Sequence, residues 1–479
     1  MVFLSISGLA ENKDHWPRLR GPQANGLPNN PNQKDLPVKW SKTDNVLWKT
    51  DVPGMGWSSP VIWGDKVFVT SVVNDKAEDN VKPRAGLYLG RGRRGVPSGK
   101  HHWMVYCMNL QTGQVLWKNE AHTGEPPVGR HPKSTYAAET PVTDGKRLYV
   151  LFGDLGLWCY DLNGKILWKH KITPKKTMFD YGAAASPVLH KNQVFYVYDN
   201  HEQSYIASLD AEKGTENWRV MRKEKSTWAT PLVWQTKDRT EIVVPGKKKI
   251  LSYGLDGKLL WELSGRMSNL VIPSPFVIDG LLYVTSGYFA DPHRPVYAIR
   301  PGASGDISLK EDQNSNDFIQ WYQPKGGPYN TTPVVYNDIY YLLLDQGMIS
   351  TYDAKTGAKL YDRVRFPRGA SFTSSPWAYK DKVFCLAENG KTYVLKAGKE
   401  FEILHVNDLD DLCMACPAII DGKLLIRTQG SIYCISGVEI IESKGHDISR
   451  WYELIKGIIL TLFSQYFPDY WTVCRGREE

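Results

Sequence analysis

The sequence predicts an all-β fold, an eight-bladed β-propeller made of four-stranded antiparallel blades. The first observation behind it is a repeated unit, Ser/Thr-Pro-apolar, followed by a turn and a Val/Leu-Phe/Tyr-Val strand. The second is spacing, because the prolines at positions 141, 187, 231 and 275 stand 44 to 46 residues apart, close to the length of a propeller blade. The third is a content of 41 Gly, 26 Tyr and 17 Trp, which favours short strands joined by tight turns.

The repeated unit predicts the inner half of each blade. Its eight copies begin at Ser59-Pro60, Thr140-Pro141, Ser186-Pro187, Thr230-Pro231, Ser274-Pro275, Thr332-Pro333, Ser375-Pro376 and Cys416-Pro417. A second half follows, as in Tyr106 to Trp117, with apolar alternation on both sides of an Asp/Asn-x-x-Thr-Gly turn, which is typical of a β-hairpin. Each repeat therefore supplies four strands.

Recurrent residues of the second half are assigned structural roles. The acidic or amide residue before the turn is expected to hydrogen-bond to the turn backbone. The large aromatic residue is expected to pack one blade against the next. The cysteines are expected to fill the core. The first group is Asn109, Asp161, Asp210, Asp256 and Asp353; the second is Trp48, Trp117, Trp168, Trp218, Trp261 and Trp321, with Tyr361 and Phe401 in blades 6 and 7; the third is Cys107, Cys159 and Cys434.

The last repeat lacks its outer strand, and the missing strand is predicted near the start of the chain. No Thr-Gly-Lys-x-x-Trp strand follows Ser431 to Ile435, whereas Val46-Leu47-Trp48-Lys49 is an isolated copy before the first repeat. Pairing of residues 46–50 with the last blade would close the ring and remove an exposed strand edge. The predicted propeller spans residues 16–436.

Connections between antiparallel strands alternate between two faces, so loop length predicts the binding face. On the face where the inner strands begin, the long connections are 73–103, 119–138, 171–185, 286–295 and 401–415. Their polar and aromatic residues at the channel mouth are expected to bind a polar ligand, anionic or carbohydrate-like, or only to solvate a funnel. These candidate residues are Arg130, His131, Ser134, Tyr136, Glu139, Asn200, Glu202, Gln203, Lys225, Trp228, Asn269, Tyr329 and Asn330.

Composition and one motif exclude other classes of function. The net charge is +8 without a Lys/Arg block, which argues against nucleic-acid binding, and 42% hydrophobic residues argue against disorder. The run from Gly90 to Gly95 spells G-x-G-x-x-G, but Pro97-Ser98-Gly99 follows where a dinucleotide site needs a helix. We interpret this run as a basic loop.

Cysteine and histidine patterns do not predict a metal centre. Seven cysteines make no disulfide framework for a chain of this size. Cys413-Met414-Ala415-Cys416 lacks the His of a haem motif and a second zinc-ligand pair, which leaves ordinary burial, with a local disulfide or redox role as the alternative. Four histidines without ligand spacing are expected to lie solvated in the loops of the binding face: His101, His102, His122 and His131.

Both chain ends are predicted to fall outside the propeller. Residues 1–10 are a short apolar stretch ending Gly8-Leu9-Ala10 and resemble a truncated export signal, with a disordered terminus as the alternative. In residues 437–479, apolar positions at i, i+3, i+4 spacing predict an amphipathic helix. It is too short and too charged to span a bilayer, so it is expected to pack on the propeller or to contact a membrane surface or a partner.

The repeat resembles that of the pyrroloquinoline-quinone-like (PQQ-like) β-propellers of the BamB type. The segments from Trp16 to Pro22 and from Gly56 to Pro60 resemble an exported bacterial subfamily of these proteins. The likeness covers about residues 16–435 and implies the fold more firmly than an activity. It implies a periplasmic or secreted scaffold that binds a protein, peptide or glycan at the long-loop face, with no catalytic residues required.

The same resemblance leaves an enzymatic alternative open, a quinoprotein oxidoreductase that holds PQQ and Ca²⁺ in the funnel. Its alcohol-dehydrogenase members carry two adjacent cysteines, and this sequence has no Cys-Cys pair. Oxygen ligands for Ca²⁺ would have to come from residues such as Glu139, Asn200, Glu202 and Asn269. The sequence identifies no catalytic residue, so the enzymatic status stays open.

Overall fold

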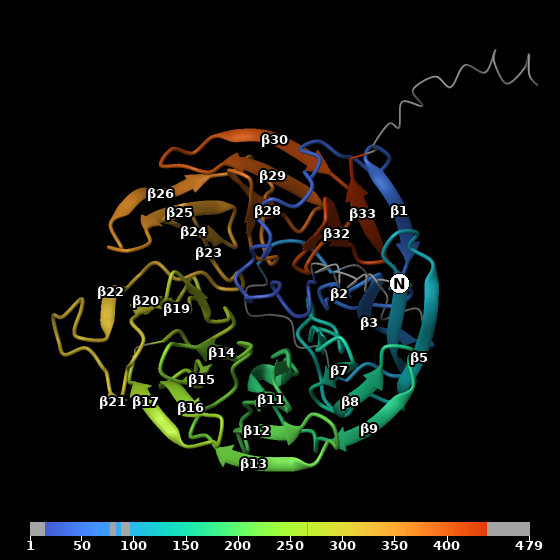
Figure 1. The fold of residues 1–479 in the computed structure, drawn as a ribbon, viewed down its shortest axis with the longest axis horizontal. Helices are drawn as coiled ribbons and strands as arrows, with labels where there is room; N and C mark the ends of the chain where they lie inside the picture. The colour runs from blue at the N-terminus through green and yellow to red at the C-terminus, as the bar shows by residue number, and fades with distance from the viewer. Residues whose placement is uncertain (1–14, 77–82, 88–95, 266, 438–479) are drawn as a thin grey trace, which may run out of the picture. The chain divides into compact units, whose positions relative to one another are not determined.

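The computed structural model describes residues 15–76, 83–87, 96–265 and 267–437. Over these residues the chain forms eight small sheets around one axis (Figure 1), which confirms the predicted eight-bladed β-propeller. The chain divides into two units, Met1–Gly437 and Val438–Glu479, and the predicted C-terminal helix, the export segment 1–10 and the run from Gly90 to Gly95 lie outside the described residues. No helix within the described part is long and apolar enough to cross a membrane.

Blades 1 to 4 follow one another along the chain, each with its first strand innermost. Blade 1 consists of β2 (Val61–Trp63), β3 (Lys66–Asn74), β4 (His101–Asn109) and β5 (Val115–Gly124). Blade 2 consists of β6 (Val142–Thr143), β7 (Arg147–Phe152), β8 (Gly156–Asp161) and β9 (Ile166–Lys171), and the 3-10 turn η2 (Met178–Asp180) follows it. Blade 3 consists of β10 (Val188–His190), β11 (Gln193–Tyr198), β12 (Tyr205–Asp210) and β13 (Glu216–Met221); blade 4 consists of β14 (Leu232–Gln235), β15 (Thr240–Val244), β16 (Ile250–Gly254) and β17 (Leu259–Leu263).

Blades 5 to 8 complete the circle. Blade 5 consists of β18 (Phe276–Ile278), β19 (Leu281–Thr285), β20 (Val296–Ile299) and β22 (Ile319–Gln323), and blade 6 of β23 (Val334–Tyr336), β24 (Ile339–Leu344), β25 (Met348–Asp353) and β26 (Lys359–Arg365). Blade 7 consists of β27 (Trp377–Tyr379), β28 (Lys382–Leu386), β29 (Lys391–Lys396) and β30 (Ile403–Asp408); blade 8 consists of β31 (Ala418–Ile420), β32 (Lys423–Arg427), β33 (Ser431–Ser436) and β1 (Val46–Asp51). Blade 4 carries one strand more than predicted, because β21 (Gly305–Asp306), from the long β20–β22 connection, pairs in parallel with β17.

The predicted closure of the ring is confirmed. Strand β1 pairs antiparallel with β33, with Trp48 opposite Cys434 and Thr50 opposite Ile432. Because β1 is the outer strand of the last blade, residues 46–51 are hydrogen-bonded in one sheet with the last strands of the propeller. The blade edge that β33 would otherwise expose is paired.

Outer-strand tryptophans tie neighbouring blades together, as predicted. The indole N–H of Trp168 donates to the backbone oxygen of Ala211 in the next blade at 3.2 Å. The indoles that make the same bond are those of Trp48 to Leu110, Trp117 to Leu162, Trp218 to Leu255 and Trp321 to Ala354. Each stacks near a turn glycine; at Gly214, which has φ +72°, a Cβ would stand 2.5 Å from the Trp168 ring. The position therefore requires glycine for both its conformation and its contact.

Two aromatic positions differ from the prediction. The Trp261 indole donates to Oε2 of the buried Glu241 at 2.6 Å, within its own blade. In blade 7 the position opposite the third strand belongs to His405, which pairs with Val394, and Phe401 lies before β30. The turn between β29 and β30 is longer than the corresponding turns of blades 1, 2, 3, 4 and 6, which leaves Phe401 before the paired strand.

The predicted turn and core residues behave as expected. Oδ1 of Asp210 accepts the backbone N–H groups of Glu212 and Lys213, and the turn residues Asn109, Asp161, Asp256 and Asp353 make bonds of the same kind. Cys107, Cys159 and Cys434 are fully buried. These residues stabilise the turns and the core of the blades.

Several predicted loop boundaries and the loop placement of three histidines are wrong. Strands β3 and β4 are each nine residues long and pair as far as Asn74 with His101. His101 and His102 therefore lie in a strand, and His122 lies in β5, where it faces Trp103. The structure also places β30 inside the predicted loop 401–415. Ladder hydrogen bonds carry these strands beyond the apolar runs that mark them in the sequence.

Candidate functional site

A cavity of about 250 Å³ lies on the propeller axis. Its wall comes from the connections that lead into the inner strands of all eight blades, with Gly86 and Leu87 added from the β3–β4 connection. Its aromatic lining residues are Trp57, Tyr181, Trp228 and Tyr329, and its larger polar ones are Arg20, His131, Lys133 and Asn330. The cavity therefore opens on the face that carries the predicted long loops.

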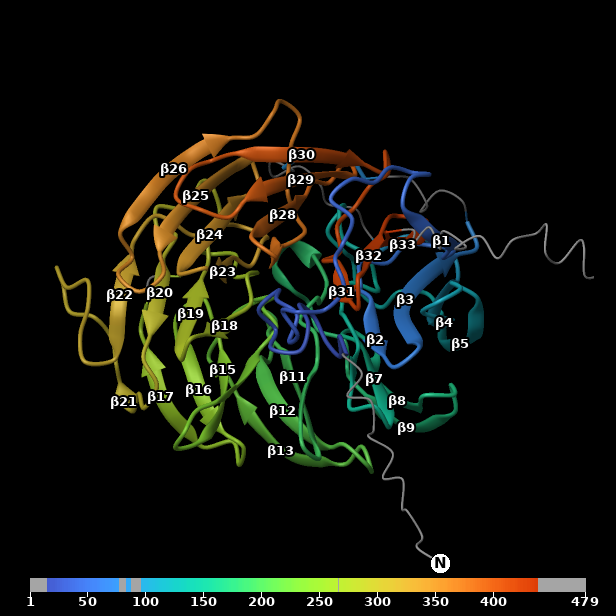
Figure 2. The ribbon, with the colours of Figure 1, turned by 45° about the horizontal axis from the view of Figure 1, so that its top comes forward.

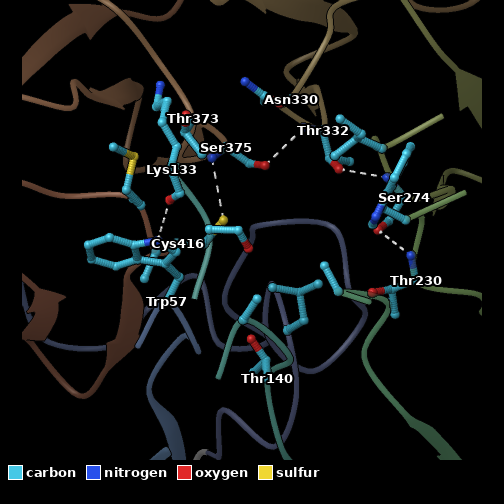
Figure 3. Close-up of a pocket in the computed structure, with 18 of the residues that line it drawn as sticks. Trp57, Lys133, Thr140, Thr230, Ser274, Asn330, Thr332, Thr373, Ser375 and Cys416 are labelled. Carbon is cyan, nitrogen blue, oxygen red and sulfur yellow. Dashed lines mark hydrogen bonds between the residues drawn. The ribbon is translucent and has the colours of Figure 1, made fainter. Parts of the chain in front are cut away.

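A closed circle of eight hydrogen bonds surrounds this cavity. Figure 3 shows the part of it that runs from Thr230 through Ser274, Thr332 and Ser375 to Cys416. In each blade, the backbone N–H of the residue before the repeat's proline donates to the side chain of the equivalent residue in the next blade, at 2.9 to 3.4 Å. In order, the members are Ser59, Thr140, Ser186, Thr230, Ser274, Thr332, Ser375 and Cys416, and the Cys416 N–H returns to the Ser59 hydroxyl. We call these eight residues the axial ring, and all of them line the cavity.

The repeated Ser/Thr-Pro pair explains the axial ring. A proline holds the residue before it in an extended conformation and has no N–H of its own. The preceding N–H is then turned toward the neighbouring blade, and only a short side chain with an acceptor atom reaches it there. The motif that set the repeat register thus also links each blade to the next at the axis.

The N-terminal segment, residues 16–26, crosses the far end of the channel. Trp16 pairs with Ile62 in blade 1, the Pro17 oxygen accepts the Thr143 N–H of blade 2, and the Gly26 oxygen accepts the Ala378 N–H of blade 7. Figures 1 and 2 both show this blue segment at the centre of the ring. Its Leu19 and Arg20 line the cavity, so the segment forms the cavity floor.

Arg20 is buried at the floor and has no acidic partner among the described residues. Its guanidinium donates to the backbone oxygens of Thr332, Pro333, Pro376 and Asn25 at 2.7 to 3.2 Å. Its Nε is buried with no partner in the described part of the chain. Burial lowers the pKa of Arg20 to about 10, which still leaves the side chain charged at neutral pH.

The other basic groups of the cavity are neutralised locally. Lys133 Nζ lies 2.6 Å from Oε1 of Glu388, whose side chain is almost fully buried. The Thr373 hydroxyl donates to the same carboxylate, and so does the Gly86 N–H, which ties loops of blades 1, 2 and 7 together. Burial lowers the pKa of His131 to about 4, so this imidazole is neutral at pH 7. The uncompensated positive charge is therefore that of Arg20.

The structure brings some of the predicted site residues to the cavity. His131, Ser134, Trp228, Tyr329 and Asn330 line it. The buried carboxylate of Asp345 accepts the backbone N–H groups of Tyr329 and Asn330 at 3.1 and 2.8 Å, which fixes that part of the wall.

Three other predicted residues, Arg130, Tyr136 and Glu139, line a separate cavity of about 10 Å³. Glu139 Oε1 accepts the Gly153 N–H at 3.0 Å, and burial raises the Glu139 pKa to about 8. Burial also raises the pKa of the nearby Asp154 to about 6. This cavity has room for a single water molecule, so we assign Glu139 and Asp154 to the structure of the wall.

The remaining predicted residues do not reach the cavity. Asn200 bonds within its own turn, to Tyr198 and to Gln203, and Glu202 accepts the Lys176 N–H. Gln203 meets Asn200 through its backbone N–H and oxygen. The last two are Lys225, which donates to the His201 oxygen, and Asn269, which donates to Asp291. Their polar atoms hold the local loop conformations.

The residues present do not fit a Ca²⁺-bound quinone. Glu139, Asn200, Glu202 and Asn269 hydrogen-bond in separate loops, and within the described ranges no three His, Cys, Asp or Glu side chains gather as metal ligands. Cys413 and Cys416 form no disulfide; Cys413 is buried, and Cys416 takes a hydroxyl's place in the axial ring.

The sequence did not identify the residue Arg20 at the floor of the axial cavity or several residues of its wall. In the sequence, Arg20 stands out only as part of the segment from Trp16 to Pro22, and no pattern assigns Trp57, Lys133 or Tyr181 to the mouth. Seven hydroxyl residues directly before a proline, one per repeat, were a signal for the axial ring. Arg20 gave no comparable signal, because three of its four partners, Thr332, Pro333 and Pro376, lie more than 300 residues away.

Comparison with known proteins agrees with this architecture. A family described as outer membrane protein assembly factor BamB (PQQ_2) matches residues 32–197 and 101–290, which together span more than half of the chain. No curated protein sequence matches the chain significantly.

Solved structures resemble the chain in fold. BamB from Moraxella catarrhalis is 12% identical, with a TM-score of 0.52 over 78% of this chain and 98% of its own. A europium-containing methanol dehydrogenase is 11% identical, with a TM-score of 0.57 over 88% and 98%. The quinohemoprotein alcohol dehydrogenase from Comamonas testosteroni is 12% identical, with a TM-score of 0.51 over 88% and 81%. At such identities the likeness shows the fold alone.

Proposed function

Because the chain belongs to the family of the outer membrane protein assembly factor BamB, we propose that it is a binding scaffold for a protein, peptide or glycan. The ligand would enter the axial cavity from the long-loop face. The observation that carries the proposal is the cavity itself, where Trp57, Tyr181, Trp228 and Tyr329 surround polar groups on a rigid ring. Aromatic walls with a few placed polar groups are typical of binding sites.

The volume of the cavity limits which part of a ligand can enter it. At about 250 Å³ it is slightly smaller than the ~300–1,000 Å³ of most small-molecule sites. One side chain, one sugar ring or the end of a chain fits that space. The rest of a large ligand would contact the loops around the mouth.

The similarity to dehydrogenases supports no second function. The two dehydrogenase structures share the propeller fold at 11 and 12% identity. The oxygen ligands that Ca²⁺ would require hydrogen-bond in separate loops instead. A scaffold role needs only the cavity and its loops.

An exported location belongs to the same proposal, since the family match is to an outer membrane assembly factor. The native host would secrete the protein or hold it in the periplasm. N-terminal sequencing of the protein recovered from its host tests this, and an intact residue 1 in a cytoplasmic fraction would contradict it.

Binding of peptide and glycan arrays, followed by calorimetry on each hit, tests the scaffold role. Trp57→Ala and Trp228→Ala are each expected to weaken binding at least ~10-fold, because alanine removes a large buried contact. Phe179→Ala is the matched control, an aromatic on the same face outside the cavity. Thermal melting confirms that each variant folds. Hits that bind both cavity variants as tightly as the wild type, or that depend equally on Phe179, would contradict the proposal.

A further inference from the structure

We propose that the axial cavity recognises a carboxylate: the hydroxyls of the axial ring and the positive charge of Arg20 receive the anionic group of an organic ligand whose apolar part lies against the aromatic wall. This inference rests on the proposed function and names the chemistry of the group that the cavity recognises. It follows from the hydrogen bonds of the ring, from the charge at the floor and from the lining above them.

The ring oxygens are already used as acceptors. Each hydroxyl of the axial ring accepts one backbone N–H, as Thr140 accepts that of Ser59 at 2.9 Å. A hydroxyl also carries one proton to donate. Among the described residues no hydrogen bond uses the proton of any of the seven ring hydroxyls, and all seven residues line the cavity. The ring therefore offers O–H donors from seven blades around one axis, and a ligand with strong acceptor atoms satisfies them.

Arg20 adds the charge that turns a donor ring into an anion site. Arg20 is 3% exposed and lines the cavity, and its guanidinium bonds only to neutral backbone oxygens in the described part of the chain. Pro333 and Pro376, two of its partners, each follow a ring residue directly, so the charge lies one residue beyond the ring, toward the floor. A buried charge without a counter-ion is unfavourable. A ligand carboxylate supplies that counter-ion.

The charge balance and the lining select an organic carboxylate. Lys133 is paired with Glu388, so a single positive charge remains, and a carboxylate with one negative charge matches it better than a doubly charged phosphate. The remaining lining includes the apolar side chains of Leu19, Leu87, Leu270, Ile272 and Met414 next to the tryptophans. A cation is disfavoured, because the charge of Arg20, which bonds only to neutral backbone oxygens in the described part of the chain, already lies at the floor of the cavity.

Calorimetry with matched small probes tests the inference on the full chain. The probes are 3-phenylpropionate, 3-phenylpropionamide, which has nearly the same shape without the charge, and inorganic phosphate. We expect the carboxylate to bind at least ~10-fold more tightly than the amide, since a charge-assisted hydrogen bond is about twice as strong as a neutral one. Phosphate is expected to bind more weakly than the carboxylate.

The outcomes separate this inference from the proposed function. Equal binding of carboxylate and amide, lost in Trp228→Ala, would leave a ligand-binding cavity and overturn the anion site. Phosphate binding as tight as the carboxylate would overturn the choice of carboxylate. If neither organic probe binds while a peptide or glycan hit still requires Trp57, the inference fails and the scaffold role stands. If nothing binds, both fail.

Ring variants supply a second readout. Cys416→Ser exchanges the one thiol of the ring for a hydroxyl and is expected to tighten carboxylate binding by ~3-fold while leaving the amide unchanged. Thr230→Val removes one donor and is expected to weaken the carboxylate selectively, whereas Thr230→Ser keeps the hydroxyl and serves as its control. Arg20→Met is expected to remove the preference for carboxylate.

Because Arg20 also ties the floor to neighbouring blades, a melting curve must accompany the Arg20→Met variant. If that variant is unfolded, Cys416→Ser and the Thr230 pair decide the question. Unchanged carboxylate-to-amide selectivity in all folded variants would overturn the inference.

Discussion

Replacing Trp48 by alanine tests the closure of the ring. The Trp48 side chain lies on β1, the outer strand of blade 8, and is 8% exposed. Its indole N–H donates to the Leu110 oxygen of blade 1 at 2.9 Å, and its ring lies directly over Gly113. The residue therefore joins the strand supplied by the start of the chain to both the last blade and the first.

The size of the effect follows from these contacts. Truncation of a buried tryptophan to alanine usually costs about 3–5 kcal/mol, through lost apolar burial and the cavity left behind. The lost indole hydrogen bond contributes about 1 kcal/mol of that sum. Trp48→Phe keeps most of the burial but not the N–H, so its cost is expected to be about 1–2 kcal/mol.

Urea unfolding followed by tryptophan fluorescence and circular dichroism measures the change, with Leu47→Ala as the control. Leu47 is the preceding residue on the same strand, and its side chain is 48% exposed. The control is expected to change the stability by less than about 0.5 kcal/mol. A Trp48→Ala variant no less stable than Leu47→Ala would refute the conclusion that this contact seals the ring.

Two further predictions concern buried ionisable groups. Arg222→Met is expected to cost about 3–5 kcal/mol, because it leaves the fully buried Asp199, now 2.9 Å from Arg222 Nε, without its counter-ion; chemical denaturation measures this, and recovery in Arg222→Met/Asp199→Leu should follow. For Glu139, burial raises the pKa to about 8, so the folded protein keeps a proton that the unfolded chain loses near pH 4.5. Its stabilising contribution is complete below pH 4.5 and is lost as the pH rises to 8, at about 1.4 kcal/mol per pH unit. The raised pKa of Asp154, about 6, also makes the stability fall as the pH rises, but at lower pH than the effect of Glu139. Glu139→Gln should therefore flatten the fall of the urea midpoint between pH 6 and 8, and an unchanged slope would show that Glu139 is not the group.

The fold was predictable because each blade repeats the same local signals. Proline, turn glycine and outer-strand tryptophan recur in register, and the isolated copy at Val46 to Lys49 could belong only to the incomplete last blade. What failed was local length. Nothing in the side chains of Asn74 and His101 marks them as paired strand residues, because their backbone hydrogen bonds to each other place them there.

Residues of the candidate site were predictable only where the direction of an inner strand places the residues before it at the channel mouth. Residues just before an inner strand, such as Trp228 and Asn330, had to lie near the mouth. Arg20 reaches the same cavity from a segment that no strand pattern describes, and only the folded ring brings it to Thr332. The ring hydroxyls were visible in seven of the eight repeats, but their shared direction is a property of the closed circle.

The segment from Trp16 to Gly26 gives the channel a single entrance. A polymer cannot thread along the axis from one side to the other, because Leu19 and Arg20 stand in its path. It can insert only a terminus or a branch, and whatever enters must leave by the way it came. One ligand must then leave before the next can bind, so the dissociation rate of the first ligand limits the rate of exchange.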